Sequence, residues 1–159
     1  ATAMWADELC TACGCYRKGL QERRADAIAN YVLRPLVEED RDEVEALNRS
    51  TYGGHDYIAA SFSSWMRRSG EGVWSAAILD GAEFCGFEVL ALWDDGATGW
   101  LQALRVHPRH RRRGLATKLQ KHLIGVAVAQ NLRQVRYTTS SENIASRRVA
   151  AQCGMEVAA

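Results

Sequence analysis

The segment LRVHPRHRRRGLA, residues 104–116, decides the fold class of this chain. A strand-like stretch runs into Pro108, which cannot donate a hydrogen bond to a strand ladder, so a strand should end there. Gly114 and Ala116 follow at the start of an apolar helical pattern. A helix N-terminus offers unpaired N–H groups and a partial positive charge, and small residues let an anion approach them closely. The segment therefore predicts a phosphate-binding turn between a strand and a helix.

Basic side chains crowd this turn and extend beyond it. Residues 96–141 carry 9 Lys/Arg and no acidic residue, whereas residues 1–95 carry 9 Lys/Arg and 17 Asp/Glu, although the whole chain has a net charge of only +1. Such a basic block favours an anionic partner, and the arginines can add charge-assisted bonds to phosphates. Nucleic acid, a membrane surface and a phosphate-rich small molecule are the candidates. The position at a helix entry favours the small molecule. The arginines of the turn are Arg109, Arg111, Arg112 and Arg113.

Length and composition set the broad class. The 159 residues fit one domain, and 47% hydrophobic with 25% charged residues exclude collagen-like, coiled-coil and disordered chains. The sequence lacks a run of about 18 uncharged apolar residues, so we expect no transmembrane helix. Five cysteines in uneven spacing predict no disulfide framework and a reducing, cytoplasmic compartment. Cys10, Cys13 and Cys15 lack a second ligand pair nearby, so we expect no metal site.

The hydrophobic pattern predicts an N-terminal tail over residues 1–28 and one domain over residues 29–159. Within the domain, strands and helices alternate, which indicates an α/β (α+β) fold with a mixed, mostly antiparallel central sheet flanked by helices. Because the chain starts at Ala1 and ends just after a helix stop at Gly154, we expect a fragment that lacks C-terminal strands. The expected strands are Tyr31–Leu36, Val73–Leu79, Glu83–Trp93, Thr98–Val106 and Gln134–Thr139; the expected helices are 38–50, Asp56–Met66, Gly114–Gln130 and Asn143–Cys153.

The turn resembles the acetyl-CoA-binding motif of the GCN5-related N-acetyltransferase (GNAT) superfamily, Arg/Gln-x-x-Gly-x-Gly/Ala. Here Arg111 opens the motif, and Gly114, Leu115 and Ala116 close it. Its place between a strand and a helix makes the match specific. The resemblance implies that Arg112 and Arg113 also contact CoA, and that Asn143 faces the CoA arm. The tyrosine that often serves as general acid in the family is replaced by Ala150.

A narrower pattern over residues 51–106 consists of Tyr52-Gly53-Gly54-x-Asp56-Tyr57, Trp65, Glu88, Asp94 and Leu104-Arg105-Val106. It resembles the vertebrate histidine N-acetyltransferase group. The superfamily resemblance implies that Leu104, Arg105 and Val106 line the cofactor, with a strand bulge and a backbone N–H that polarises the thioester carbonyl. The alternative is an ordinary strand end. Gln102 stands where that group would have Glu, so it can orient water or substrate but cannot act as a base.

Glu88 is the candidate general base, because burial among apolar neighbours would raise the pKa of its carboxyl toward neutrality. The alternative is an outward-facing strand carboxylate. For the acceptor site the candidates are Tyr52, Asp56 and Tyr57, which lie in a loop and helix start. Asp56 could instead be a helix N-cap, and Tyr57 could belong to the core.

The predicted function is direct, acetyl-CoA-dependent transfer of an acetyl group to the amine of a small amino acid, with histidine as one candidate, or of another primary amine. We expect an acyltransferase with no metal cofactor, a small-molecule partner, and neither nucleic acid nor membrane as partner; a homodimer stays an open alternative. The second hypothesis is an inactive acyl-CoA-binding module or truncated product. The third is a nucleic-acid binder that uses the basic block, against which the acidic first half argues.

Overall fold

The computed structural model describes residues 30–49, 51, 56–93 and 96–157. The expected tail over residues 1–28, with its three cysteines, lies outside the described residues. Tyr52, one of the acceptor candidates, lies outside them as well. The other candidate site residues all belong to the described part of the chain.

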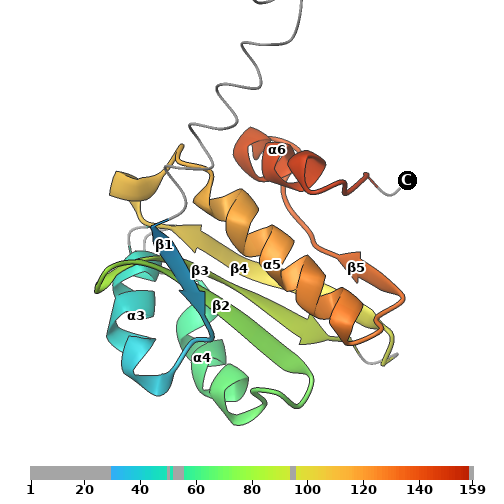
Figure 1. The fold of residues 1–159 in the computed structure, drawn as a ribbon, viewed down its shortest axis with the longest axis horizontal. Helices are drawn as coiled ribbons and strands as arrows, with labels where there is room; N and C mark the ends of the chain where they lie inside the picture. Colours follow the sequence, from blue (N-terminus) through green and yellow to red (C-terminus); the bar gives the residue numbers. More distant parts are fainter. Residues whose placement is uncertain (1–29, 50, 52–55, 94–95, 158–159) are drawn as a thin grey trace, which may run out of the picture.

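One five-stranded sheet organises the domain, with strands in the order β1-β2-β3-β4-β5 (Figure 1). The first four strands pair antiparallel with their neighbours, and β5 pairs parallel with β4. This arrangement confirms the predicted mixed, mostly antiparallel sheet. The strands are β1 Tyr31–Arg34, β2 Val73–Asp80, β3 Glu83–Leu92, β4 Thr98–Val106 and β5 Gln134–Arg136.

Helices cover both faces of this sheet (Figure 1). Residues from α3, α4 and one side of the strands form one apolar cluster, and residues from α5 and the other side form a second. Val89 of β3 belongs to the first cluster and Leu90 to the second, as strand alternation requires; Cys85 and Phe87 lie in different clusters because the register against β2 shifts between them. The helices are α3 Arg41–Arg49, α4 Ile58–Arg67, α5 Leu115–Ala129 and α6 Ile144–Gln152, with short 3₁₀ turns η1 Glu38–Asp40 and η3 Pro108–His110.

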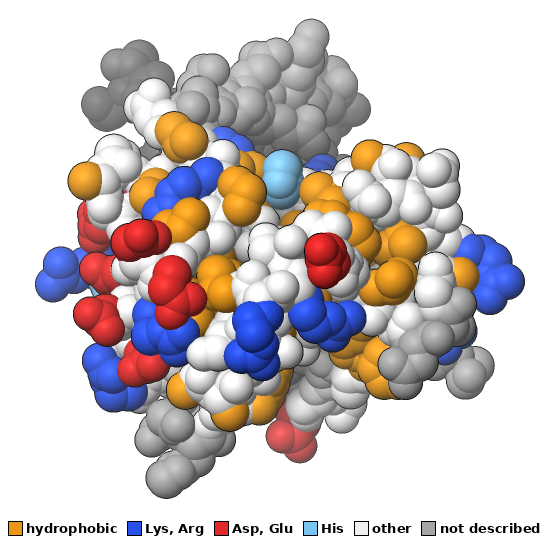
Figure 2. Space-filling view, turned by 90° about the horizontal axis from the view of Figure 1, so that it is seen from below, with side chains coloured by type: hydrophobic (Ala, Val, Ile, Leu, Met, Phe, Trp, Pro, Cys, Tyr) orange, Lys and Arg blue, Asp and Glu red, His pale blue; other side chains and the backbone are white. Residues whose placement is uncertain are grey.

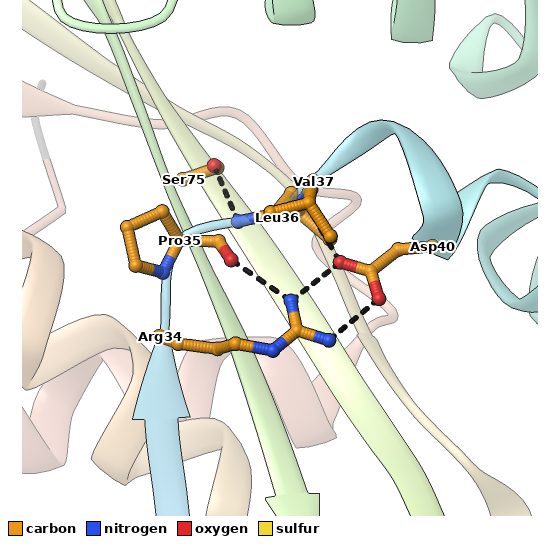
Figure 3. Close-up of polar contacts among 6 residues, drawn as sticks. All are labelled: Arg34, Pro35, Leu36, Val37, Asp40 and Ser75. Atoms are coloured by element: carbon orange, nitrogen blue, oxygen red, sulfur yellow. Dashed lines mark hydrogen bonds and ion pairs between the residues drawn. The ribbon is translucent and has the colours of Figure 1, made fainter.

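The crossing from β1 to α3 is fixed by a part-buried ion pair (Figure 3). The Arg34 guanidinium donates to both carboxylate oxygens of Asp40, at 2.6 and 2.7 Å, and the Val37 N–H donates to the same carboxylate at 2.9 Å. Burial would raise the pKa of Asp40, but these hydrogen bonds outweigh burial and hold the pKa below its ordinary value. The strand predicted over Tyr31–Leu36 ends two residues earlier in the structure, at Arg34, because Pro35 interrupts the ladder.

The charge asymmetry of the sequence has a counterpart on the surface. The first turns of η1 and α3 carry acidic side chains. In Figure 2 most of the acidic side chains in view gather on the left, which is the side where Figure 1 draws α3. The arginine-rich turn lies at the entry to α5. None of the described helices is long and apolar enough to cross a membrane.

Candidate functional site

The turn that enters α5 has the geometry of an anion cradle. Gly114 occupies the N-cap position in the left-handed conformation, with φ 86°, and Arg112 is also left-handed, with φ 62°. The first hydrogen bond of the helix runs from the Lys118 N–H to the Gly114 carbonyl at 3.0 Å. Among the described residues, no backbone carbonyl accepts from the N–H groups of residues 112–117. These donors, together with the helix dipole, can bind a phosphate group.

The arginines of the turn point in different directions. The Arg111 Nε donates to the Val106 carbonyl at 3.1 Å, which folds this side chain along the end of β4. Arg113 donates to the Tyr31 hydroxyl at 2.8 Å, so its guanidinium is turned toward β1. Arg112 is exposed. The guanidinium of Arg113 keeps further N–H donors beside this bond, so its predicted contact with CoA stays a prediction.

Leu115 and Ala116 contribute through their backbone. The Leu115 side chain is buried in the cluster beneath α5, so only its N–H group can face an anion. Ala116 is half-buried at the same helix start. Small or inward-facing side chains therefore keep the first turn of α5 clear for a ligand.

One edge of β4 opens toward the same end of the molecule. β5 pairs with β4 only at Thr98–Trp100, although β4 continues to Val106. Within the described residues, the edge of β4 from Leu101 to Val106 therefore has no strand partner on the β5 side. The predicted strand over Gln134–Thr139 ends early, at Arg136, where this separation begins. Leu104, Arg105 and Val106 lie on this edge, which leads to the turn. The Leu104 carbonyl accepts from the Arg105 guanidinium at 3.0 Å, and the Val106 carbonyl accepts from Arg111 at 3.1 Å.

A bulge in β4 sits at this opening. The register shifts between Phe87, which pairs with Arg105, and Val89, which pairs with Gln102. Ala103 takes up the extra residue with φ 60°. Its N–H donates to the Tyr57 hydroxyl at 3.1 Å, across from α4. The bulge expected from the family resemblance is present.

Glu88 lies opposite this bulge and is buried, with 2% of its surface exposed. Its register partner on β2 is Ala76, which belongs to the cluster under α5, so the carboxyl lies on the α5 face. One carboxyl oxygen, Oε2, has no hydrogen-bond partner among the described residues. Burial raises the pKa of Glu88 well above its ordinary value. The alternative of an outward-facing carboxylate is wrong.

Gln102 lies on the opposite face of the sheet. Its register partner Val89 belongs to the cluster under α3 and α4, and paired residues of antiparallel strands project to the same face. The structure therefore does not bring Glu88 and Gln102 together on one face.

The described acceptor candidates, Asp56 and Tyr57, lie on the face of Gln102. Asp56 forms an ion pair with Arg105, and both side chains are largely buried. The other Asp56 oxygen accepts from the Tyr57 N–H at 2.7 Å. Tyr57, not Asp56, stands at the N-cap of α4, so the N-cap interpretation of Asp56 is wrong. The Arg105 side chain lies with these residues, and only its backbone belongs to the open edge.

Tyr57 is not a core residue, because 47% of its surface is exposed. Its ring meets Trp65 edge-on, with centroids 6.4 Å apart, and its hydroxyl reaches the bulge. Partial burial raises the pKa of the phenol. Tyr57 thus links the start of α4 to the backbone of β4.

Asn143 occupies the N-cap of α6, where its Oδ1 accepts from the Ser146 N–H at 3.0 Å. Its amide N–H groups and the second lone pair of Oδ1 would be available to a cofactor. Ala150, at the position of the family tyrosine, is buried. Gly154 ends α6 with φ 77°, as its predicted role as a helix stop requires.

These donors fit CoA chemically. The unpaired N–H groups at the start of α5 suit a pyrophosphate, and the open edge of β4 suits an extended arm that carries amides. The part of the chain that the structure describes contains no group of three or more His, Cys, Asp or Glu side chains placed to hold a metal ion.

One group of residues at this end of the molecule was missed by the sequence analysis. His110 was given no role from the sequence, but it is buried and contacts Tyr31 and Glu83. Tyr31 and His110 are separated by 79 positions, so no local pattern could have indicated their contact.

Known proteins share this architecture. A histidine N-acetyltransferase of Oreochromis niloticus is 34% identical over 80 residues, which cover 50% of this chain and 23% of that protein. An aminoglycoside N-acetyltransferase in complex with CoA superposes with a TM-score of 0.69 at 20% identity, covering 81% of this chain and 90% of that one. The ribosomal-protein-S18-alanine N-acetyltransferase of Escherichia coli superposes with a TM-score of 0.69 at 17% identity, covering 81% of this chain and 79% of that one. At these identities the two structures show similarity of fold alone.

The chain spans about a quarter of the length of the curated relatives it matches. The family model described as the acetyltransferase (GNAT) family, in contrast, matches residues 35–155. That range includes every described strand except the first, and all the described helices. The open strand edge, the bulge and the helix entry thus occur in a chain that belongs to the acetyltransferase (GNAT) family.

Proposed function

We propose that this domain is an acetyl-CoA-dependent N-acetyltransferase that transfers acetyl directly to the amine of a small amino acid. The observation that carries the proposal is that a candidate anion-binding helix start and a strand edge suited to an amide-containing arm lie at the same end of the molecule. Unpaired N–H groups at the start of α5 lie at the end of a β4 edge that β5 leaves open beyond Trp100. The similarity to histidine N-acetyltransferases makes histidine the first acceptor to test. A protein N-terminus, a lysine side chain and a polyamine are the other amine classes.

Each predicted residue has a task in this scheme. The backbone of the turn and the side chains of Arg111, Arg112 and Arg113 hold the phosphates, with Arg113 also bonded to the Tyr31 hydroxyl. The backbone of Leu104–Val106 and the Asn143 amide orient the rest of the cofactor. When bound, acetyl-CoA supplies the acetyl group as a reactive thioester. Asp56 and Tyr57 border the place of the acceptor, and Tyr52, which lies outside the described residues, is assigned to the acceptor from its sequence position.

Glu88 takes up the proton of the acceptor ammonium in this proposal, through water at the open edge. Its burial supports the role, because a carboxyl with a raised pKa is a better proton acceptor at neutral pH than an exposed one. Gln102, on the acceptor face, orients water or substrate. Ala150 cannot donate a proton to a departing thiolate, so solvent serves there.

The scheme includes a cytoplasmic location. Both described cysteines, Cys85 and Cys153, are free thiols, which agrees with a reducing compartment. An amino acid acceptor fits the part-buried polar surroundings of Asp56 and Arg105 better than a nucleic acid would.

Isothermal calorimetry with acetyl-CoA tests the proposal, with Gly114→Glu as the disabling variant. A side chain at the left-handed N-cap strains the backbone, and its charge repels phosphates. Gly81→Glu is the matched control, because Gly81 is also left-handed, with φ 58°, and has open space around its Cα. We expect binding in the wild type and the control, and none in Gly114→Glu. Binding followed by acetylation of histidine supports the proposal; absence of binding by the folded wild type contradicts it.

The second candidate is an acyl-CoA-binding module without turnover. Ala150 at the position of the family tyrosine favours it. Tight CoA binding without acetylation of any amine in a full-length protein would support this candidate over the enzyme.

A further inference from the structure

His110 forms a buried polar contact that the proposed chemistry does not use. Only 5% of its surface is exposed, although it belongs to the arginine-rich turn. Its Nδ1 lies 3.1 Å from the Tyr31 hydroxyl on β1, and its Nε2 lies 3.1 Å from a Glu83 carboxylate oxygen at the start of β3. The turn is thus held to two strands through one side chain.

One assignment of donors and acceptors gives a partner to every polar group in the contacts around His110. Arg113 can only donate, so the Tyr31 oxygen accepts from it at 2.8 Å. The Tyr31 proton is then free to be donated to Nδ1 of His110. The Nε2–H of His110 in turn donates to Glu83, whose ionised carboxylate can only accept. A neutral imidazole with its proton on Nε2 completes this chain without an unused donor.

We propose that His110 is a positioning residue for the phosphate cradle. The series of hydrogen bonds Arg113–Tyr31–His110–Glu83 anchors the turn at residues 110 and 113, on either side of the left-handed Arg112. Arg112 lies between the two anchored positions and keeps a left-handed φ of 62°, which a residue with a side chain adopts only under constraint. The inference rests on the proposed function for the identity of the anion, a phosphate of CoA.

A second contact shows that β1 takes part in this arrangement. The Lys118 Nζ, in the first turns of α5, donates to the Tyr31 carbonyl at 2.6 Å. Tyr31 therefore receives a donor from the turn at its hydroxyl and a donor from the helix at its backbone. The bond from His110 to Glu83 also lowers the pKa of that carboxylate, which agrees with a direct interaction. The cradle is fixed by the sheet as well as by its own sequence.

Tyr31→Phe tests the proposal, because it removes one oxygen atom and keeps the ring. Calorimetry with CoA and with pantetheine separates phosphate binding from binding of the arm. We expect the affinity for CoA to fall about tenfold, the scale of a lost hydrogen bond to a charged group, with the affinity for pantetheine unchanged. Ser75→Ala is the control, because it also removes a buried hydroxyl group. The Ser75 Oγ accepts from the Leu36 N–H at 3.0 Å, just after β1, and is not bonded to the turn.

The outcomes are distinct. A wild type that binds neither CoA nor pantetheine contradicts the proposed function and the positioning role together. A wild type that binds CoA while Tyr31→Phe binds it equally well contradicts the positioning role alone. Equal loss of both ligands in Tyr31→Phe shows a purely structural role and also overturns the inference.

Nitrogen NMR of the His110 ring provides a readout that does not depend on a ligand. We expect a neutral ring with the proton on Nε2 in the wild type and loss of that single-tautomer pattern in Tyr31→Phe. A proton on Nδ1 would reverse the chain and overturn the proposal. If Tyr31→Phe fails to fold in circular dichroism, Glu83→Gln, which changes the exposed end of the chain, replaces it in the same titrations.

Discussion

The turn that enters α5 and the bulge in β4 are two parts of one candidate site, yet they arise in different ways. The turn takes its anion-binding character from neighbours in sequence, since the proline, the arginines and Gly114 lie within seven positions. The bulge depends on partners far away: the Ala103 N–H bonds to Tyr57, 46 positions earlier. A local site can bind a ligand in many folds, whereas a site assembled from distant elements can orient two reactants.

The two regions also differ in electrostatics. The turn concentrates positive charge at a solvent-exposed helix entry. The bulge lies opposite a buried carboxyl whose neighbours are apolar. Binding energy should therefore come from the turn, and proton transfer from the bulge region. Substitutions can separate these two contributions.

The largest effect should follow from Glu88→Gln in the bulge region. The amide keeps the shape of the side chain but cannot take up a proton. We expect turnover with histidine to fall about 100-fold or more, the range of a lost general base, with the affinity for CoA unchanged. Steady-state kinetics and calorimetry on the same sample measure the two quantities.

Glu71→Gln, an exposed acid near β2, is the matched control and should behave as the wild type. If Glu88→Gln turns over normally, proton uptake does not occur on the α5 face. The acceptor face with Gln102 would then be the place to search.

The next effect should follow from Arg111→Ala in the turn. This removes a guanidinium that lies along the end of β4 and opens the motif. We expect the KM for acetyl-CoA to rise about tenfold while kcat stays near the wild-type value. Arg67→Ala, at the end of α4, removes an exposed guanidinium of the same kind elsewhere and serves as control. A fall in kcat without a change in KM would place Arg111 with the bulge region.

The contrast between the locally encoded turn and the bulge, which depends on distant residues, also explains which features the sequence predicted and which it did not. The strands over residues 73–106, the helix at 115 and the helix stop at Gly154 follow from periodicity and turn chemistry, and the structure has them within two residues. The burial of Glu88 was also predicted from its apolar neighbours. Such features depend on residues close in sequence, so a pattern can indicate them.

Features that depend on pairing were not predicted. The opposite faces of Glu88 and Gln102 follow from the register of β3 against β4, which shifts at the bulge. The ion pair between Asp56 and Arg105 joins residues 49 positions apart, and it turns a predicted cofactor residue toward the acceptor side. A single sequence without structure does not fix such a register.

A smaller effect should follow from Tyr57→Phe, which removes the acceptor of the bulge N–H. Loss of one part-buried hydrogen bond should lower the free energy of unfolding by about 1 kcal/mol. Because the bulge amide is then free to reorient, kcat should fall several-fold more than the affinity for CoA. Chemical denaturation and kinetics measure both, with Tyr137→Phe as a control hydroxyl deletion. Equal effects of the two deletions would show that Tyr57 does not support the bulge.

The smallest expected effect is on the pH dependence of stability, where Glu88 and Glu83 should act in opposite directions. Burial raises the pKa of Glu88 above its ordinary value of 4.5, so its contribution to stability is complete below pH 4.5 and is lost as pH rises through the higher folded-state pKa. The bond from His110 lowers the pKa of Glu83, so its contribution is present above pH 4.5 and is lost as pH falls through the lower folded-state pKa.

Melting temperatures of both Gln variants between pH 3 and pH 8, a range chosen to bracket the ordinary carboxyl pKa of about 4.3, should therefore diverge. Relative to the wild type, Glu88→Gln should gain stability as pH rises, because the wild type must either ionise a buried carboxyl or hold its proton against the solvent. Glu83→Gln should lose stability above the ordinary carboxyl pKa and match the wild type in acid. Its loss should be small, because the Glu83 side chain is about half exposed and water screens the interaction. Parallel curves for the two variants would mean that the turn and the bulge share one electrostatic environment, and the division of binding and proton transfer between them would be wrong.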